Sequence, residues 1–310
     1  MSRKQLIVIV LLPVLLALGY LAITQTVPKH DGLLTMTAID VGQGDSIFLR
    51  MPNGKTVLID GGGHNDSMDL SKVSDVGEKT VLPFLRHEGV NRVDLIILTH
   101  PHGDHVGGLS AVVRALPVGR VLDGTVLPCD AEAYRRFIDD TAARRVPRQR
   151  AVRGMRIQLG EVAMDVLNPP GSGEPYGTEP NNDTVNNYST VVRVTYGRTH
   201  LMLTGDAQTE AEDSMIEAYP NGLQCDVLKC GHHGAHNATS DEWLSAVRPS
   251  VAVISCAAHN RYGHPAPQTM AALVQHHVTP YITARDGAVT VTSDGSRVTV
   301  TTERERSGGK

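Results

Sequence analysis

The chain of 310 residues is poor in aromatic side chains and carries no excess of basic charge. Only 4% of its residues are Phe, Trp or Tyr, and its formal net charge is -4 at pH 7. This charge argues against general binding of polyanions by the whole surface, although bound divalent cations or local basic clusters reverse the sign where they lie. No internal repeat is evident. With 41% hydrophobic residues, the chain can bury a substantial core.

Cysteine is also scarce, and its spacing excludes one kind of metal site. The four cysteines are widely separated and no two form a Cys-x-x-Cys pair. This spacing argues against a zinc site built from cysteines, and we interpret the four as buried apolar residues. Cys230 and Cys256 both follow predicted core strands, so a disulfide between them stays open for an exported protein.

Long apolar runs are absent except near the amino terminus. Arg3 and Lys4 precede an almost unbroken apolar stretch at residues 6–23, a pattern typical of an export signal. The length of this stretch lies between a signal-peptide core and a minimal membrane-spanning helix, so both cleavage and retention stay open. We expect residues 1–32 to form a signal or anchor segment with its linker. We favour retention as a single membrane anchor, with the rest of the chain outside the cytoplasm, or secreted if the segment is cleaved.

Beyond residue 32 the sequence alternates between strand and helix patterns. Strands are predicted at residues 34–41, 46–51 and 56–59, and the turn Pro52-Asn53-Gly54 joins the last two in a hairpin. The alternation continues to about residue 302 and is interrupted at residues 168–187 by a long loop rich in Pro, Gly and Asn. That loop is a candidate active-site or surface loop. Antiparallel strands at the start of each half, with helices outside, predict an α/β fold of the αββα sandwich type.

The densest group of candidate metal ligands follows the apolar run at residues 93–98. The sequence Thr99-His100-Pro101-His102-Gly103-Asp104-His105 holds four potential ligands within six residues. Burying so many polar groups at the end of a core strand is unfavourable unless a cation compensates them. In an extended segment His100 and His102 point to the same side, and Asp104 and His105 begin the following turn. We therefore predict a metal site here, with one segment serving two cations.

Further carboxylates and histidines lie near or after the ends of other predicted strands. They are Asp40, Asp45, Asp60, Asp206, His232, His233 and His264. Asp60 precedes three glycines that allow a sharp turn, so its carboxylate would face a cleft and orient a ligand. Asp206 follows the apolar triplet Leu201-Met202-Leu203, and its two carboxylate oxygens suit a bridge between two cations. For Asp40 and Asp45 a ligand-orienting role and an ordinary turn role both stay open.

Taken together, these motifs resemble a known family. The segments Leu58-Ile59-Asp60-Gly61-Gly62, His100-x-His102-x-Asp104-His105 and Leu203-Thr204-Gly205-Asp206 are similar to successive motifs of the metallo-β-lactamase superfamily. More narrowly, Ile39 to Asp45, Gly231-His232-His233-Gly234 and Asn260 to Pro265 resemble the metallo-hydrolase domain of ComEC-type competence proteins. The resemblance covers residues 33–302, which we predict to be the hydrolase domain, followed by a disordered tail at residues 303–310.

The resemblance implies an αββα fold, two divalent metal ions (Zn²⁺ or Mn²⁺) and hydrolysis of a phosphodiester. His100 and His102 would hold one cation, Asp104 and His105 the other, and Asp206 would bridge them. Asp60, Asp104 and His233 are assigned to catalysis, and His232 and His264 to remaining metal positions. The superfamily usually has one more histidine before the bridging Asp, where this chain reads Asn186-Asn187-Tyr188-Ser189. One of the three later histidines is expected to compensate.

The function predicted from these features is that of a metal-dependent phosphodiesterase or nuclease acting on DNA by metal-activated water. Eight arginines at residues 135–156 favour phosphate binding, but few aromatics accompany them, so a solvated surface explains them equally well. Two alternatives stay open, a hydrolase of a small phosphodiester such as a phosphorylcholine ester and a non-catalytic DNA-capture module. No second apolar run is long enough to span a membrane, so DNA uptake would need a separate channel protein as partner.

Overall fold

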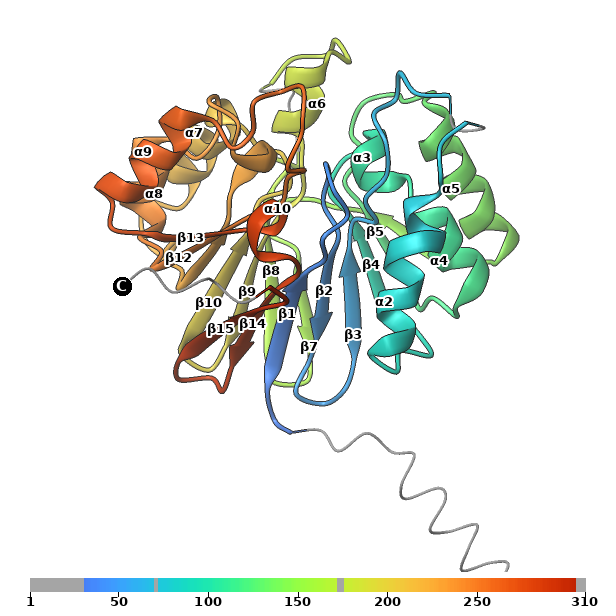
Figure 1. Cartoon of the computed structure of the whole chain (residues 1–310), viewed down its shortest axis with the longest axis horizontal. Helices are drawn as coiled ribbons and strands as arrows, with labels where there is room; N and C mark the ends of the chain where they lie inside the picture. Colours follow the sequence, from blue (N-terminus) through green and yellow to red (C-terminus); the bar gives the residue numbers. More distant parts are fainter. Residues whose placement is uncertain (1–30, 70–71, 172–175, 305–310) are drawn as a thin grey trace, which may run out of the picture. The chain divides into compact units, whose positions relative to one another are not determined.

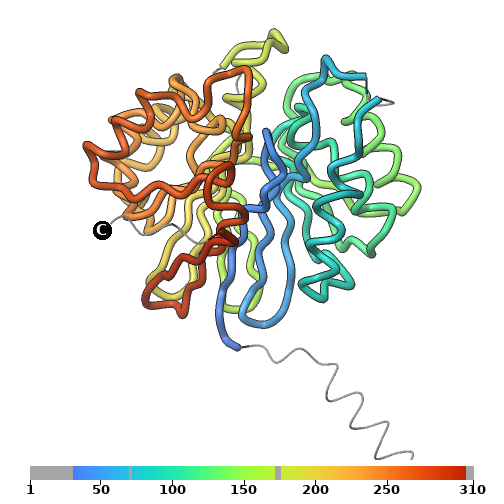
Figure 2. The backbone as a smooth tube through the Cα atoms, viewed as in Figure 1, coloured from blue at the N-terminus to red at the C-terminus, as the bar shows by residue number. Residues whose placement is uncertain are grey.

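Two β-sheets pack face to face, and helices cover the outer face of each sheet (Figure 1). The structure is a computed structural model that describes residues 31–69, 72–171 and 176–304. Within these residues one sheet has eight strands in the order β15-β14-β1-β2-β3-β4-β5-β6, and the other has seven in the order β13-β12-β11-β10-β9-β8-β7. Figure 2 shows that the last strands of the chain, drawn in red, return beside the first strand, drawn in blue. The predicted αββα sandwich is confirmed.

The first sheet comprises β1 (Leu34–Ala38), β2 (Ile47–Arg50), β3 (Thr56–Ile59), β4 (Leu95–Leu98), β5 (Val121–Asp123), β6 (Arg148–Arg150), β14 (Val289–Ser293) and β15 (Val298–Thr302). The second comprises β7 (Arg156–Leu159), β8 (Val162–Asn168), β9 (Val191–Tyr196), β10 (Thr199–Leu203), β11 (Val227–Lys229), β12 (Val251–Ile254) and β13 (Thr279–Ile282). Each sheet mixes antiparallel hairpins with parallel pairs, and the predicted hairpin at residues 46–59 is the antiparallel pair of β2 and β3.

Helices lie in two outer groups. Beside the first sheet are the π-helical turn η1 (Gly77–Val81), α2 (Leu82–His87), α3 (Gly103–Val106), α4 (Leu109–Ala115) and α5 (Glu132–Ala143). Beside the second are α7 (Thr209–Ala218), α8 (Asp241–Val247) and α9 (Pro267–Gln275). The short helices α6 (Asn182–Asn187), η2 (Gly231–Gly234) and α10 (Thr283–Asp286) lie in loops that follow strands.

Alternation along the strands builds three apolar cores, which explains why the central strands are apolar at every position. In β4, Leu95 and Ile97 belong to the core between the two sheets, whereas Ile96 and Leu98 pack against the helices of the first sheet. In β11, Val227 faces the other sheet and Leu228 faces the second group of helices. Successive side chains of a strand point to opposite faces, so a strand between two layers has to be apolar on both.

Several short elements were not predicted, among them α6 and β6. Residues 168–187 were expected to form a loop, but they include α6, whose first turn is capped by the Asn181 side chain accepting a hydrogen bond of 3.0 Å from Thr184 N. Asn and Asp are favoured at helix ends and disfavoured inside helices. A short helix rich in Asn therefore lacks the regular spacing of apolar residues from which helices are predicted. Strand β6 is polar and lies at the edge of its sheet, where no apolar pattern is required.

Several sequence predictions fall wholly or partly outside the described residues. The predicted signal or anchor at residues 1–32 is described only at Asp31 and Gly32. Within the described ranges no helix is long and apolar enough to cross a bilayer. In the predicted C-terminal tail, Glu303 donates its backbone N–H to Ala288 O, and Arg304 pairs with Asp40. All four cysteines are free thiols, and Cys225, Cys230 and Cys256 are buried as expected.

Three glycines allow the loop after β3 to touch the helices beside it. A Cβ atom added at Gly108 would lie 2.1 Å from Gly61 O and 2.9 Å from Gly77 Cα. The same contact is fixed by hydrogen bonds, because Gly61 N donates to His105 O at 2.7 Å and Gly108 N donates to Gly62 O at 2.9 Å. The position of His105 relative to the end of β3 therefore depends on this close approach.

Replacing Gly108 with Ala should separate these segments. Gly108 has a φ of -82°, which any residue adopts, so the cost is steric and should be about 1–3 kcal/mol of unfolding free energy. Because His105 moves with the segment, affinity for Mn²⁺ should also fall. Urea unfolding and calorimetric titration with Mn²⁺ measure both effects.

Gly89→Ala is the control for this change. Gly89 has a φ of +68°, and no atom lies within 4 Å of an added Cβ. The substitution should therefore lower the free energy of unfolding by about 1 kcal/mol through backbone strain and leave Mn²⁺ affinity unchanged. If Gly108→Ala were as stable as the parent and bound Mn²⁺ equally, the close approach would not position the site.

Candidate metal centre

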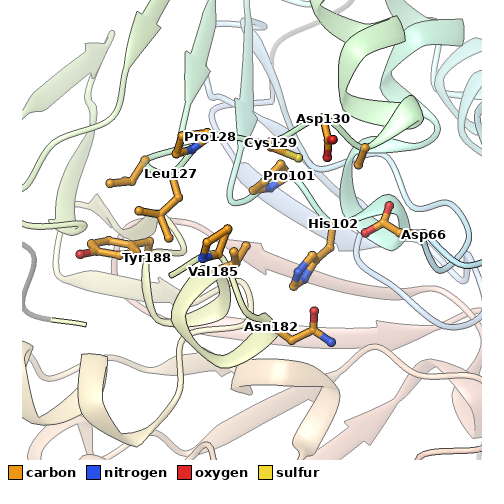
Figure 3. A pocket seen from close by; sticks show the side chains of 14 residues that line it. Asp66, Pro101, His102, Leu127, Pro128, Cys129, Asp130, Asn182, Val185 and Tyr188 are labelled. Atoms are coloured by element: carbon orange, nitrogen blue, oxygen red, sulfur yellow. The ribbon is translucent and has the colours of Figure 1, made fainter. Parts of the chain in front are cut away.

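Two adjoining cavities open where the carboxyl ends of central strands from both sheets meet. The larger has a volume of about 430 Å³ and is lined by Gln43, Asn65, Asp66, His102, Asp104, Asn182, Asp183, Asn186, Asp206, His232, His233, Ala235, His236, Asn237, Tyr262 and His264. The smaller, of about 190 Å³, shares Asp66, His102 and Asn182 with it (Figure 3). In layered α/β proteins the carboxyl ends of strands are the usual place for a ligand site.

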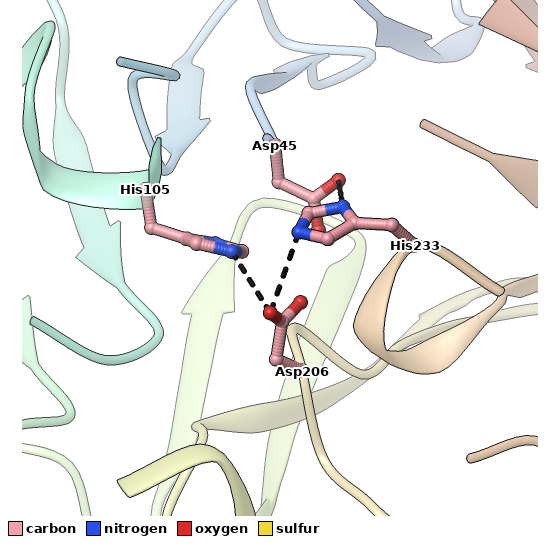
Figure 4. Close-up of side chains that lie close together, drawn as sticks. All are labelled: Asp45, His105, Asp206 and His233. Atoms are coloured by element: carbon pink, nitrogen blue, oxygen red, sulfur yellow. Dashed lines mark ion pairs between the residues drawn. The ribbon is translucent and has the colours of Figure 1, made fainter. Parts of the chain in front are cut away.

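Four buried side chains converge beside the larger cavity, and their potential ligand atoms all lie within 4.8 Å of one another: Asp45, His105, Asp206 and His233. Figure 4 shows both imidazole rings pointing at the Asp206 carboxylate, which lies between them. Asp206 Oδ2 is 3.2 Å from His105 Nε2 and 3.3 Å from His233 Nε2. The four residues come from segments far apart in the sequence, before β2, in α3, after β10 and in η2.

The cluster has the properties of a cation site. Asp206 Oδ1, His105 Nε2 and His233 Nε2 are buried and make no hydrogen bond within the described part of the chain. Buried polar atoms are nearly always hydrogen-bonded unless they have another partner, such as an ion. Imidazole nitrogens together with carboxylate oxygens suit Zn²⁺ or Mn²⁺. The residues therefore fit a divalent cation.

Both imidazoles are held so that Nε2 faces the centre. His105 Nδ1 donates to Asp60 Oδ2 at 2.8 Å, and the Thr99 backbone N–H and hydroxyl also donate to Asp60. His233 Nδ1 lies 3.0 Å from the Ser255 carbonyl oxygen, which only accepts, so this nitrogen carries the proton. Such hydrogen bonds fix the tautomer and the ring orientation of metal-binding histidines. Asp60 thus lies behind the His105 ring, on the side away from the cluster, and it does not join the cluster itself.

The predicted pair His100 and His102 lies next to the cluster. His100 Nε2 is 3.0 Å from His102 Nδ1 and 3.9 Å from Asp206 Oδ2. On the other side of its ring, His100 Nδ1 is 3.3 Å from Ser189 Oγ, which accepts a hydrogen bond from Asp206 N. Asp206 Oδ2 is therefore within 4 Å of His100, His105 and His233, and the bridging role of Asp206 stays a prediction.

Electrostatics divides the histidines into two groups. Burial, followed by the charges of neighbouring histidines, holds the pKa of His100 well below its ordinary value, so this ring is neutral and ready to ligate. Burial would also lower the pKa of His105 and His233, but nearby carboxylates outweigh it. Asp206 and Asp60 raise the pKa of His105 well above its ordinary value, and Asp206 and Asp104 raise that of His233 to about 10. A cation would displace these protons.

Comparison with known proteins decides the family. A model described as the metallo-beta-lactamase superfamily matches residues 39–259. The chain belongs to this superfamily. It is 32% identical over 260 residues to ComE operon protein 3 of Bacillus subtilis and 31% identical over 253 residues to competence protein ComA of Neisseria gonorrhoeae. The predicted resemblance to the superfamily and to competence proteins is confirmed.

The relatives are much longer than this chain. Each alignment covers 81% of the chain but only 32% and 31% of the two competence proteins, so the chain spans about a third of their length. Among solved structures, YhfI of Bacillus subtilis, a metallo-beta-lactamase fold protein, matches with a TM-score of 0.51 and 13% identity over 86% of this chain and 99% of YhfI. This similarity supports the fold. Members of the superfamily are generally hydrolases that bind divalent cations, which agrees with the cluster.

An amide side chain lies in the region of the sequence where the superfamily usually has one more histidine. Asn186 lines the larger cavity, and its Nδ2 lies 3.3 Å from His232 Nε2. His232 and His233 both have left-handed backbone conformations, with φ of 47° and 57°, and this strained turn brings both rings to the cavity. Three histidines could replace the missing ligand: His232, His233 and His264. Of these, His233 lies nearest to Asp206 Oδ2, at 3.3 Å, and His232 follows at 4.0 Å.

His264 and Asp104 lie at the edge of the group. The His264 ring is half-buried, with its centroid 6.2 Å from that of His233 and 5.5 Å from that of His232. Asp104 Oδ2 is 3.6 Å from His233 Nε2, so it lies within reach of the cluster. The sequence assigned His233 to catalysis, whereas its place among the buried ligand atoms favours a metal-binding role.

The site also contains a buried ion pair that the sequence interpretation did not assign. Lys229 Nζ lies 2.8 Å from Asp45 Oδ2, and neither side chain is more than 1% exposed. The Lys229 ammonium also donates to Cys230 O at 2.8 Å. The pair joins the end of β11 in one sheet to the loop before β2 in the other. A lysine ending an apolar strand, as in Val227-Leu228-Lys229, is the signal that could have found it, since a buried lysine needs a buried anion.

The cation-free protein should lose stability as the pH rises above 7. A histidine whose pKa is raised in the folded state contributes stability below about pH 6.5, and this contribution disappears as the pH approaches the folded-state pKa, about 10 for His233. The loss is at most about 1.4 kcal/mol per pH unit for each proton. The raised pKa values of Asp66 and Glu212, about 6 and about 7, place most of their titration below pH 7.5, where the measurement begins.

Urea unfolding with a chelator at pH 7.5, 8.5 and 9.5 measures this slope. His233→Gln should show a shallower slope because one of the two protonated groups is gone, and the Mn²⁺-loaded protein should not show the loss. A stability that rises with pH in the chelated parent would contradict the assignment of protons to His105 and His233.

Metal content tests the ligand set directly. The parent protein should bind about two divalent ions. Asp206→Asn should bind fewer, since Asp206 is the predicted bridging carboxylate, and His102→Ala should lose one ion. Asp213→Asn, on the exposed side of α7, is the matched control and should behave as the parent. Elemental analysis after dialysis measures the ion count, and full occupancy in Asp206→Asn would refute the bridging position.

Proposed function

We propose that this protein is a metal-dependent phosphodiesterase that hydrolyses DNA and is held outside the cytoplasm by residues 1–32. The observation that carries the proposal is the buried cluster of His and Asp ligands at an open cavity. Membership of a hydrolase superfamily supports hydrolysis, and similarity to competence proteins supports nucleic acid as the substrate class.

The charge of the larger cavity supports a phosphodiester as substrate. Among the described residues no Lys or Arg lines this cavity, whose polar lining includes the amides of Gln43, Asn65, Asn182, Asn186 and Asn237. A phosphodiester carries one negative charge, which cations at the cluster can balance. A phosphomonoester or a polyphosphate carries more negative charge, and proteins usually meet it with Arg or Lys.

The residues of the chain would prepare the site for this reaction. Divalent cations, when bound, lower the pKa of a coordinated water so that hydroxide is available near neutral pH, and they neutralise charge on the phosphate. Asp60 and the Ser255 carbonyl keep the Nδ1 protons of His105 and His233 away from the centre. Lys229 Nζ pairs with Asp45 Oδ2. The other oxygen, Asp45 Oδ1, lies 3.8 Å from His233 Nδ1. The amides of the lining can donate hydrogen bonds to phosphate oxygens.

The arginine segment lends this proposal little support. Arg148 pairs with Asp123 at 3.1 Å, Arg156 pairs with Asp165 at 3.2 Å, and Arg153 donates to Leu167 O at 2.8 Å. Arg136 and Arg144 also have partners within the chain. None of the segment's arginines lines either cavity at the metal centre. This placement favours the solvated-surface interpretation of the segment.

Hydrolysis assays on the full chain in detergent test the proposal. Single-stranded and double-stranded oligonucleotides and bis(p-nitrophenyl) phosphate should be compared with Mn²⁺ and with Zn²⁺. Asp206→Asn should abolish turnover, and Asp60→Asn should reduce it by about 10- to 100-fold because His105 loses its orienting partner. Asp213→Asn should retain full activity.

Two results would replace the proposal with an alternative. DNA binding by the cation-loaded protein without any hydrolysis would indicate a capture module. Turnover of small phosphodiesters without any turnover of DNA would indicate a small-molecule hydrolase.

A further inference from the structure

The smaller cavity beside the metal centre carries a further inference, which rests on the proposed function. We propose that this side cavity binds one unstacked base of a single-stranded nucleic acid, next to a phosphate at the metal centre. This side cavity is lined by residues 124, 126–131, 180, 182, 185 and 188 together with Asp66, Pro101 and His102.

The side cavity adjoins the metal centre through shared residues. Asp66, His102 and Asn182 line both cavities. The His102 ring is also 3.0 Å from His100 Nε2, so the boundary between the cavities is one side chain away from the group around Asp206. A substrate whose phosphate lies at the cluster therefore has its neighbouring groups at the entrance of the side cavity.

The lining of the side cavity has two kinds of surface. Figure 3 shows Leu127, Pro128, Val185 and Tyr188 together on one side, and Asp66, His102 and Asn182 on the other. A nucleobase has the matching character, with apolar ring faces and an edge that forms hydrogen bonds. Proteins that recognise single strands bind extruded bases by contact with the faces and hydrogen bonds to the edge.

The volume allows one ring system. A protein cavity of about 150 Å³ can hold benzene, so the 190 Å³ of the side cavity has room for a small heterocycle but not for a base pair. The walls are rigid: Pro101, Pro128 and Pro180 lie in them. The Tyr188 hydroxyl donates to Gly177 O at 3.2 Å, and its ring packs against the edge of Tyr176.

This geometry selects single strands. A base in a duplex is stacked and paired, so it reaches a side cavity only after it is extruded, which costs a few kcal/mol. A base in a single strand enters without this cost. The side cavity therefore predicts a preference for single-stranded substrates and for phosphodiesters that carry a base.

A choline group is the competing occupant, because the carboxyls of Asp66 and Asp130 also lie in the lining. Proteins bind quaternary ammonium groups in cages of several aromatic faces. Among the described residues of this lining, Tyr188 is the one Phe, Tyr or Trp, and the His102 imidazole is the other aromatic ring. The two carboxyls suit the exocyclic amino group of cytosine or adenine, which donates hydrogen bonds.

Matched esters test the inference. Methyl, deoxycytidine (both the 5′ and the 3′ ester) and choline p-nitrophenyl phosphates share a leaving group and differ in the second substituent. The full chain loaded with Mn²⁺ should show kcat/KM at least about tenfold higher for one of the deoxycytidine esters than for the methyl ester.

Filling the side cavity should remove this preference. Val185 is half-buried in its wall, so Val185→Trp should bring the ratio of the two kcat/KM values close to one, and Leu127→Trp is the second variant in case the first does not fold. Val274→Trp is the control, since Val274 on α9 is 68% exposed, and its ratio should equal that of the parent. An unchanged ratio in both cavity variants, or a preference of the parent for the choline ester, overturns the inference.

A binding assay separates this inference from the proposed function. If the parent hydrolyses no ester and no oligonucleotide, the proposed function fails, but fluorescence anisotropy with labelled oligodeoxycytidine still reports on the side cavity. Val185→Trp should then raise Kd at least about tenfold relative to Val274→Trp. Equal Kd values for the two variants overturn the inference in that case as well.

Discussion

The structure depends on balancing carboxylates that are buried where the two sheets meet. The side chains of Asp45, Asp60 and Asp206 are each at most 4% exposed. Lys229 is the buried permanent cation that pairs with one of them, Asp45. The other two depend on His105 and His233, which can be protonated or can ligate a cation. Buried charges are stable only when they are paired, so positive charge at this position is a condition of the fold as well as of the chemistry.

The two sheets meet this condition by each supplying part of the site. Asp45, His105 and their supporting residues belong to the first sheet and its loops, whereas Asp206, Lys229 and His233 belong to the second. The Lys229 and Asp45 pair and the contact of His105 with Asp206 both cross between the sheets. Any movement of one sheet against the other would separate opposite charges in a region that water hardly reaches. The site and the packing of the sheets therefore stabilise each other.

Sequence reasoning found the parts of the site that are encoded locally. The candidate ligands from His100 to His105 lie in one segment that runs from the end of β4 into α3, so their close spacing in the sequence was enough to single them out. Asp206 could be predicted because an apolar strand ends just before it. The role of Asp45 was left open because it depends on Lys229, which lies 184 residues away. The inward position of His232 and His233 depends on two left-handed residues, and a Gly-His-His-Gly sequence does not fix that conformation. Helix α6 was missed because its capping residues carry no apolar period.

The arrangement separates two tasks that nucleic-acid enzymes often combine on a basic surface. In the proposed function, cations at the cluster meet the phosphate charge, while amides and an apolar side cavity meet the rest of the substrate. Positive charge is then needed only where the reacting phosphate lies, which is consistent with a net charge of -4 on the whole chain. Few lysines or arginines would contact the backbone, so few counterions would be released on binding. Affinity would then depend more on divalent cations and on fit to an unstacked base than on general attraction to a polyanion.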